Sequence, residues 1–305
     1  MAGTSFDIAV IGGGIAGLTA AHHAALAGAS VVHFVEDGLP GGLVINVGAL
    51  DGWPAAGPVG GAELAAGLMG QNEELGVTLV PSRIDRLEGG ATRTLHGADG
   101  VWRARQVILA TGATLKTLDV PGAERLAGRG VSQCAWCDGG LYRDADVVVA
   151  GGGDSALSEA LHLGAFARTI TIVTRGERFR ARNHYVSRIA SDERYHLRWA
   201  SEIVEVSGAD GVESVRVRDR ESGTHEDIPC TGLFVFVGLT PNAGLAGPEI
   251  ARDAGGFLVT DANFEAAAPG VFAIGAVRSG YGGRLTQAVG EATTAAEIAA
   301  ARCES

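Results

Sequence analysis

The chain has 305 residues, of which 46% are hydrophobic and 19% are charged. It is therefore long enough to bury a sizeable core, and its composition excludes intrinsic disorder. A net charge of −11 disfavours nucleic acid as a partner, because phosphate binding requires clustered basic residues. Glycine, with 47 residues, occurs at about twice its usual frequency, which indicates tight turns and close backbone approaches.

The sequence shows no targeting signal, but it contains one informative cysteine pair. No uninterrupted apolar run is long enough to span a membrane, and the segment from Met1 to Phe6 contains no basic region. We therefore expect no membrane partner, no signal peptide and a cytoplasmic location. Cys230 and Cys303 stand alone, whereas Cys134–Cys137 is a C-x-x-C pair, whose spacing indicates redox or metal chemistry.

The first glycine-rich segment follows a short apolar stretch. Residues 7–11 predict a strand that ends in the turn 12–17, and an alanine-rich helix follows to about Ala27. A second strand is predicted at 31–35 and ends at Glu36. Strand, glycine turn, helix and strand in this order place a pyrophosphate at a helix N-terminus.

A second copy of this pattern begins at residue 146. A strand at 146–150 ends in the turn 151–156, a helix runs to Leu163, and a strand follows at 169–173. In both turns the first glycine allows the tight bend, the next lets the backbone approach a phosphate, and the last small residue permits close helix packing. The predicted cofactor-binding residues of the two turns are Gly12, Gly14, Ile15, Ala16, Gly17, Gly151, Gly153, Asp154, Ser155 and Ala156.

The end of the second strand in each copy distinguishes the two ligands. Glu36 can accept hydrogen bonds from an unphosphorylated ribose, so the first site suits FAD. Arg175 stands at the matching position of the second copy, and Arg180 follows; both would attract a 2′-phosphate, so this site favours NADPH. The alternative is that these arginines belong to a solvated surface loop.

Further apolar strands are predicted at 107–112, 233–238 and 270–275, and a final helix from about Leu285 to Arg302. We therefore predict an α/β fold of two Rossmann-like, three-layer ββα nucleotide-binding domains, the second inserted in the first. The chain crosses between them near residues 115 and 239. The predicted FAD-binding domain is 1–115 and 239–305, and the predicted NAD(P)-binding-like domain, with the C-x-x-C, is 116–238.

The cysteine pair is the predicted catalytic centre. Cys134 and Cys137 on the first turn of a helix can form a disulfide, and the following Asp138 can exchange a proton with the leaving thiolate. A zinc site would need further ligands, and Cys230 and Cys303 lack the spacing for them, so we expect no metal. Purely structural cysteines, and a capping or surface role for Asp138, are the alternatives.

Taken together, these motifs resemble the low-molecular-weight thioredoxin reductase family of FAD-dependent pyridine nucleotide-disulfide oxidoreductases. The similarity runs nearly from end to end and includes the segments 12–17, 41–42, 53–54, 110–113, 128–132, 134–139, 151–156, 159–161, 179–181, 241–242 and 269–273. It implies FAD in the split domain, a redox disulfide in the inserted one, and a homodimer. It also implies that Cys137 faces the flavin while Cys134 attacks the external disulfide. The FAD-binding residues expected from it also include Gly42, Leu43, Asn46, Ile84, Thr111, Gly112, Gly275, Arg284 and Leu285.

The chain departs from the family pattern at a few positions. Ala276 stands where the family places an aspartate for the ribityl chain, and Gly283-Arg284 stands near its Arg-Gln pair. Thr174-Arg175-Gly176 replaces its His-Arg-Arg, and the loop 43–52 lacks the threonine-rich run of bacterial reductases.

The leading hypothesis is a thioredoxin-reductase-like enzyme that passes electrons from NADPH through FAD and the cysteine pair to a disulfide. The substrate is a thioredoxin-like protein or a small molecule. The first alternative is a dithiol oxidase that forms a disulfide in a small molecule and passes the electrons to oxygen. The second is a non-catalytic redox sensor.

Overall fold

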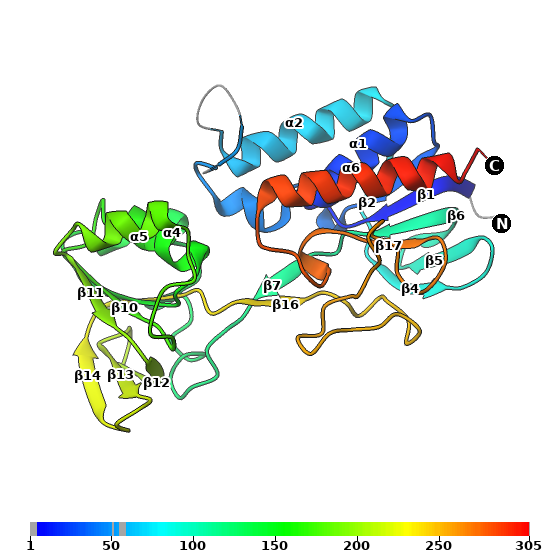
Figure 1. Cartoon of the computed structure of the whole chain (residues 1–305). Coiled ribbons are helices and arrows are strands. Elements are labelled where there is room, and N and C mark those ends of the chain that lie inside the picture. The colour runs from blue at the N-terminus through cyan, green and yellow to red at the C-terminus, as the bar shows by residue number, and fades with distance from the viewer. Residues whose placement is uncertain (1–4, 51, 55–58, 305) are drawn as a thin grey trace. The chain divides into compact units, whose positions relative to one another are not determined.

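The structure is a computed structural model that describes residues 5–50, 52–54 and 59–304 (Figure 1). The start of the segment from Met1 to Phe6, and Asp51 in the 43–52 loop, lie outside the described residues. The chain forms two compact units: unit 1 consists of Met1–Thr114 and Thr240–Ser305, and unit 2 of Leu115–Leu239. Unit 2 is therefore an insertion in the sequence of unit 1.

Unit 1 is built on a seven-stranded sheet. Its order is β3-β2-β1-β6-β5-β4, and β17 also pairs with β6. β3, β2, β1, β6 and β17 run parallel, whereas β5 pairs antiparallel with β6 and with β4. The strands are β1 (Ser5–Ile11), β2 (Val31–Phe34), β3 (Thr78–Val80), β4 (Ile84–Glu88), β5 (Arg93–Gly97), β6 (Gly100–Leu109) and β17 (Val271–Ala273).

The described part of unit 1 contains three helices: α1 (Ile15–Leu26), α2 (Gly61–Glu74) and α6 (Leu285–Ala301). In Figure 1 they run side by side over one face of the sheet. Alanines form much of the α1–α6 contact, because small side chains let two helix backbones approach closely. They are Ala20, Ala21, Ala24, Ala292, Ala295, Ala296 and Ala299, and they share a core with Ile8, Val10 and Ile108 of the sheet.

Unit 2 has three layers. Its central sheet is parallel, with the order β11-β10-β9-β15-β8. α4 (Asp154–Leu163) and α5 (Asn183–Ala190) pack on one face, around Val147, Val149 and Ile170, and a three-stranded antiparallel sheet packs on the other. The strands are β8 (Val131–Ser132), β9 (Asp146–Ala150), β10 (Thr169–Val173), β11 (Tyr195–Arg198), β12 (Ser201–Ser207), β13 (Ser214–Asp219), β14 (His225–Pro229) and β15 (Gly232–Val235).

Short elements complete the chain. The paired strands β7 and β16 include the two points at which the chain passes between the units. None of the helices in the described residues combines the length and the apolar character of a membrane span. The short elements are β7 (Ala113–Leu115), β16 (Leu239–Pro241), α3 (Ala135–Asp138), and the 3₁₀ turns η1 (Glu36–Gly38), η2 (Gly42–Asn46), η3 (Gly139–Tyr142) and η4 (Gly275–Val277).

Among the predicted strands, those at 107–112, 233–238 and 270–275 differ most in extent from the observed ones. The strand expected at 107–112 begins earlier, as β6, because exposed residues such as Val101 and Arg103 alternate with inward-facing ones along its first half. The strands expected at 233–238 and 270–275 are shorter, as β15 and β17. Gly238 and Gly275, with φ angles of 113° and 67°, bend the backbone away after them.

Candidate functional site

The first glycine turn lies between β1 and α1. Gly12 has a φ of 119°, and a side chain there would collide with the carbonyl oxygen of Ala110, so only glycine fits. Gly14, the N-cap residue of α1, is different. Among the described residues outside its own neighbours, no atom lies within 4 Å of the position that a Cβ would take.

The N-terminus of α1 faces the open space beside Gly14. Its N-cap makes no side-chain hydrogen bond, and the first amide groups of a helix have no intrahelical acceptor. Helix amides beside a glycine whose Cβ position is open form a cradle that fits a phosphate group. The predicted residues Ile15, Ala16 and Gly17 supply these amides.

A buried histidine supports the turn from behind. His33 on β2 is 1% exposed, and its Nε2 lies 2.9 Å from the carbonyl oxygen of Gly12. Because a carbonyl can only accept, Nε2 donates this hydrogen bond. Burial lowers the pKa of His33 to about 4, so the ring is neutral at pH 7. Sequence reasoning missed His33, whose residue type alone does not reveal that it is buried.

Glu36, predicted to bind a ribose, lies in η1 directly after β2 and is exposed. Arg83 Nη1 lies 3.6 Å from its Oε1, an exposed ion pair worth at most about 1 kcal/mol. A ribose hydroxyl can therefore compete for this carboxylate at little cost. Ile84, the next residue after Arg83, directs its side chain into the core of unit 1, so only its backbone could contact a cofactor.

Two loops hold further predicted residues. Thr111 Oγ1 donates to the carbonyl oxygen of Asn242 at 2.8 Å, and Asn242 Nδ2 donates to the carbonyl oxygen of Thr111 at 2.9 Å. This pair fixes Thr111 and Gly112 after β6. In the other loop, the amide of Gly41 donates to the carbonyl oxygen of Gly13, which places η2 with Gly42, Leu43 and Asn46 next to the first glycine turn.

The remaining predicted FAD residues of unit 1 follow β17. The amide of Gly275 donates to Oε2 of Glu291 at 2.8 Å, and Glu291, 3% exposed, also pairs with Arg278. Glu291 was not predicted because it lies on α6, far along the chain. Arg284 is the N-cap residue of α6, its carbonyl oxygen accepts a hydrogen bond from Tyr281 Oη at 3.0 Å, and Leu285 begins that helix.

The second glycine turn repeats the geometry of the first. Gly151 has a φ of 141°, and a side chain there would collide with the carbonyl oxygen of Phe236. Gly153, the N-cap residue of α4, again has no neighbouring atom in the described chain within 4 Å of its would-be Cβ, and its cap makes no side-chain hydrogen bond. Ser155 in the first turn of α4 is exposed, and Ala156 packs against Gly151.

The loop after β10 folds onto this second turn. The amide of Arg180 donates to the carbonyl oxygen of Gly152 at 2.8 Å. Arg182 binds the carboxylate of Asp154 twice, through its amide at 2.7 Å and through Nε at 2.9 Å. Asp154 is thus engaged by the protein itself.

Exposed arginines stand on the same loop. The side chains of Arg175 and Arg180 are exposed beside the turn. Arg220, just after β13, donates from Nη1 to the carbonyl oxygen of Arg175 at 3.0 Å. Arg220 thus adds a cation that the loop sequence alone did not indicate.

Cys134 and Cys137 form a disulfide in unit 2, with their Cα atoms 5.3 Å apart. Cys134 is the N-cap residue of α3, and its Sγ accepts a hydrogen bond from the amide of Cys137 at 3.0 Å. Cys137 is exposed and Cys134 is partly buried. The amide donor would stabilise a thiolate on Cys134 once the pair is reduced.

Polar and aromatic groups surround the disulfide. Ser132 Oγ donates to Asp138 Oδ2 at 2.7 Å and accepts from the amide of Cys134 at 3.1 Å. Asp138 is thereby tied to the redox turn. Trp136, between the two cysteines, stacks on His162 of α4 with ring centroids 3.7 Å apart.

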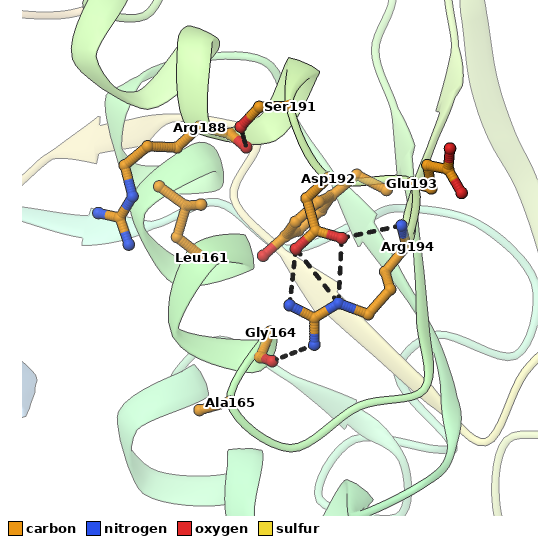
Figure 2. Close-up of a pocket in the computed structure, with 9 residues that line it drawn as sticks. Leu161, Gly164, Ala165, Arg188, Ser191, Asp192, Glu193 and Arg194 are labelled. Atoms are coloured by element: carbon orange, nitrogen blue, oxygen red, sulfur yellow. Dashed lines mark hydrogen bonds and ion pairs between the residues drawn. The ribbon is translucent and has the colours of Figure 1, made fainter.

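A hollow of about 800 Å³ in unit 2 has no part in this site (Figure 2). It lies at the carboxyl end of α4, away from Gly153. Arg194 in its wall is already bound to Asp192 and to the carbonyl oxygen of Gly164. Within residues 5–50, 52–54 and 59–304, no group of three or more His, Cys, Asp or Glu residues could hold a metal ion.

The chain is similar to known proteins over nearly its whole length. The model of the pyridine nucleotide-disulphide oxidoreductase family matches residues 6–298. The chain belongs to this family. It is 32% identical to the thioredoxin reductase of Listeria innocua, over 96% of this chain and 92% of that protein. It is also 32% identical to that of Treponema pallidum, over 97% of both.

Solved structures of thioredoxin reductases have the same fold as this chain. The thioredoxin reductase of Lactococcus lactis superposes with a TM-score of 0.93 at 32% identity, covering 98% of this chain and 99% of that one. That of T. acidophilum superposes with a TM-score of 0.90 at 28% identity, covering 99% of both. The predicted family and the predicted fold of two Rossmann-like domains are confirmed. The oxidoreductase is an FAD-dependent thiol–disulfide enzyme, with FAD and NADPH as its cofactors.

Proposed function

We propose that this oxidoreductase reduces the disulfide of a thioredoxin or thioredoxin-like protein with electrons from NADPH. The relatives from Listeria innocua and Treponema pallidum, both thioredoxin reductases, support this substrate. The observation that carries the proposal is the Cys134–Cys137 disulfide, which lies in the same unit as the second glycine turn and exposes Cys137.

The two glycine turns divide the cofactors between the units. The open N-terminus of α1 with Gly12, Gly14 and Glu36 would hold FAD in residues 1–115 and 239–305. The N-terminus of α4 with Gly153 would hold the NADPH pyrophosphate in residues 116–238, and Arg175 and Arg180 would bind its 2′-phosphate. Bound FAD supplies two-electron transfer from NADPH to the disulfide.

The remaining chemistry belongs to the cysteine pair. The thiolate of Cys134, which the amide of Cys137 stabilises, attacks one sulfur of the substrate disulfide. This forms a mixed disulfide, and the released substrate sulfur takes the proton that Asp138 accepted when the thiol of Cys134 ionised. The thiolate of Cys137 then attacks Cys134, which releases the second substrate thiolate and restores the Cys134–Cys137 disulfide. Two electrons have then passed to the substrate.

The oligomeric state and the cellular location are inferred from the relatives and from the cysteine pair. We infer a homodimer, which the likeness to thioredoxin reductases supports, and a cytoplasmic location, which a redox-active cysteine pair supports. Sedimentation of the purified protein at micromolar concentration tests the first inference, because a monomer would contradict it. The reductase relatives disfavour the dithiol oxidase considered from the sequence.

Anaerobic steady-state kinetics test the function. NADPH consumption should require a thioredoxin disulfide, and a Cys134→Ser variant should abolish it. A small dithiol with oxygen is the control substrate. Turnover with oxygen and a dithiol, but not with NADPH and thioredoxin, would show that the chain is an oxidase.

A further inference from the structure

One carboxylate beside the redox turn has no part in the mechanism above. Glu159 lies on α4, and its Oε2 accepts a hydrogen bond from the amide of Ala135 at 2.7 Å. The amide of Trp136 also donates to this carboxylate. Ala135 and Trp136 are the two residues between the cysteines. Glu159 therefore holds the backbone of the C-x-x-C segment from a different element.

The same contacts place a negative charge against the two residues that follow the attacking Cys134. In the reduced pair, the amide of Cys137 would stabilise a thiolate on Cys134. The amides that follow Cys134 are already occupied by Glu159. A carboxylate bound to this turn and a thiolate on it repel each other, and in a partly buried place water screens this repulsion only weakly.

The surroundings keep this charge out of bulk water. Burial raises the pKa of Glu159, and its two backbone hydrogen bonds act in the opposite direction. The other titratable groups around the turn are Asp138, which accepts from Ser132, and His162, which stacks on Trp136. Burial lowers the pKa of His162, so its ring is neutral at pH 7 and brings no positive charge. Tyr142 on η3 is uncharged there too, because burial raises its pKa.

We propose that Glu159 is a positioning residue for the redox pair: it fixes the turn between the cysteines, and its charge makes the Cys134 thiolate less stable and the disulfide state more favourable. This inference rests on the proposed function of the pair. It adds that the balance between disulfide and dithiol is set from α4, the helix that begins at the second glycine turn.

The test compares two substitutions in the FAD-loaded protein. Glu159→Gln keeps an oxygen that can accept from both amides but removes the charge, whereas Glu159→Asp keeps the charge on a shorter side chain. Glu193→Gln, an exposed carboxylate of the same unit, is the matched control. The readout is the rate at which iodoacetamide alkylates Cys134 in the reduced protein, followed by mass spectrometry between pH 5 and pH 10.

Glu159→Gln should raise the thiolate-to-thiol ratio of Cys134 about tenfold, so that its alkylation profile shifts about one pH unit lower. Its equilibrium with glutathione should move about tenfold toward the dithiol, equivalent to about 30 mV. Glu159→Asp and Glu193→Gln should titrate as the unaltered protein does. An unchanged profile in Glu159→Gln, or equal shifts in Glu159→Gln and Glu159→Asp, would overturn the proposal.

Two further measurements keep the result decisive. If Glu159→Gln lacks the native circular dichroism, Glu159→Asp decides: because it keeps the charge, an unchanged Cys134 profile supports the proposal and a shift of about one pH unit overturns it. Alkylation also needs no turnover. A protein without reductase activity but with the predicted shift would refute the proposed function and leave the role of Glu159 intact.

Discussion

At the scale of single residues, His33 is a neutral imidazole inside unit 1 that donates to the turn at Gly12. Its pKa of about 4 lies below the ordinary 6.5, so the unfolded chain binds a proton at higher pH than the folded chain does. The stability that this difference provides is complete above about pH 6.5 and is lost as the pH falls to about 4. The total is about 3 kcal/mol.

Replacing His33 by Gln should remove this dependence. Gln keeps an N–H that can reach the carbonyl oxygen of Gly12 but cannot be protonated. Between pH 7 and pH 4.5 the urea midpoint, measured by flavin fluorescence, should fall less in His33→Gln than in the unaltered protein. His184→Gln, an exposed control, should behave as the unaltered protein. An equal fall of the urea midpoint in all three proteins would show that a group other than His33 causes the loss of stability at low pH.

The two cysteines should differ when each is replaced. Cys137→Ser should trap a mixed disulfide between Cys134 and the substrate, because the second thiolate that resolves it is missing. Cys134→Ser should form no such adduct, although Cys137 is the more exposed sulfur. Mass spectrometry of the reduced variants with an oxidised thioredoxin measures both outcomes. An adduct on Cys137 alone would reverse the proposed roles.

At the scale of elements, the two glycine turns allow a test that separates folding from binding. Alanine fits at Gly14, where φ is −71° and no described neighbour is close, and should cost at most about 1 kcal/mol as an N-cap. It would still occupy the space proposed for a phosphate. Gly14→Ala should therefore keep its fold and bind FAD at least tenfold more weakly in a fluorescence titration.

Two comparison variants complete this test. Gly12→Ala should disturb folding itself, because its φ of 119° and the nearby Ala110 carbonyl oxygen exclude a side chain. Gly67→Ala on α2, an exposed glycine with open space around it, should leave FAD binding unchanged. Normal FAD affinity in Gly14→Ala would rule out a phosphate at this helix.

The arginine loop beside the second turn should determine the choice of electron donor. Each charge-assisted contact to a 2′-phosphate is worth about 1.5–3 kcal/mol, so two give a preference for NADPH over NADH on the order of 10². Replacing Arg175 and Arg180 by Ala should erase this preference in anaerobic flavin reduction, without altering reduction by dithiothreitol. Arg188→Ala is the control. A loop that only contacts solvent would predict no change.

How well a strand could be predicted depends on whether it forms a continuous buried apolar run. β9 was predicted within its exact bounds because Val147, Val148 and Val149 are buried on both faces and form a continuous apolar run. β12, β13 and β14 were not predicted, because their buried residues are interrupted by partly or fully exposed ones and form no such run.

For the site, the distance along the chain decides what can be predicted. Glycine turns, the cysteine pair and Asp138 are local motifs, so residue spacing alone could predict them. Glu159 contacts a turn more than one element away, and Arg220 reaches Arg175 from a different sheet. Such contacts depend on tertiary packing, which residue spacing does not encode.

At the scale of the whole molecule, the last part of unit 1 completes a core that its first part begins. β17 pairs with β6, and α6 covers α1. A chain that ends at residue 269 would lack both and would expose Ile8 and Val10. It should bind no FAD, and trypsin should digest unit 1 while unit 2, which is continuous in sequence, resists. FAD binding by this truncated chain would contradict the expectation.

The insertion also sets an order of events during translation. The ribosome delivers β1 to β6, α1 and α2 of unit 1, then all of unit 2, and only then β17 and α6, which complete unit 1. Domains generally fold as units while the chain is made. Unit 2 can therefore fold first. Until α6 is made, the partial sheet of unit 1 has an apolar face without its full cover. From the synthesis of residue 115 until α6 is made, a chaperone or fast elongation would protect residues 1–114.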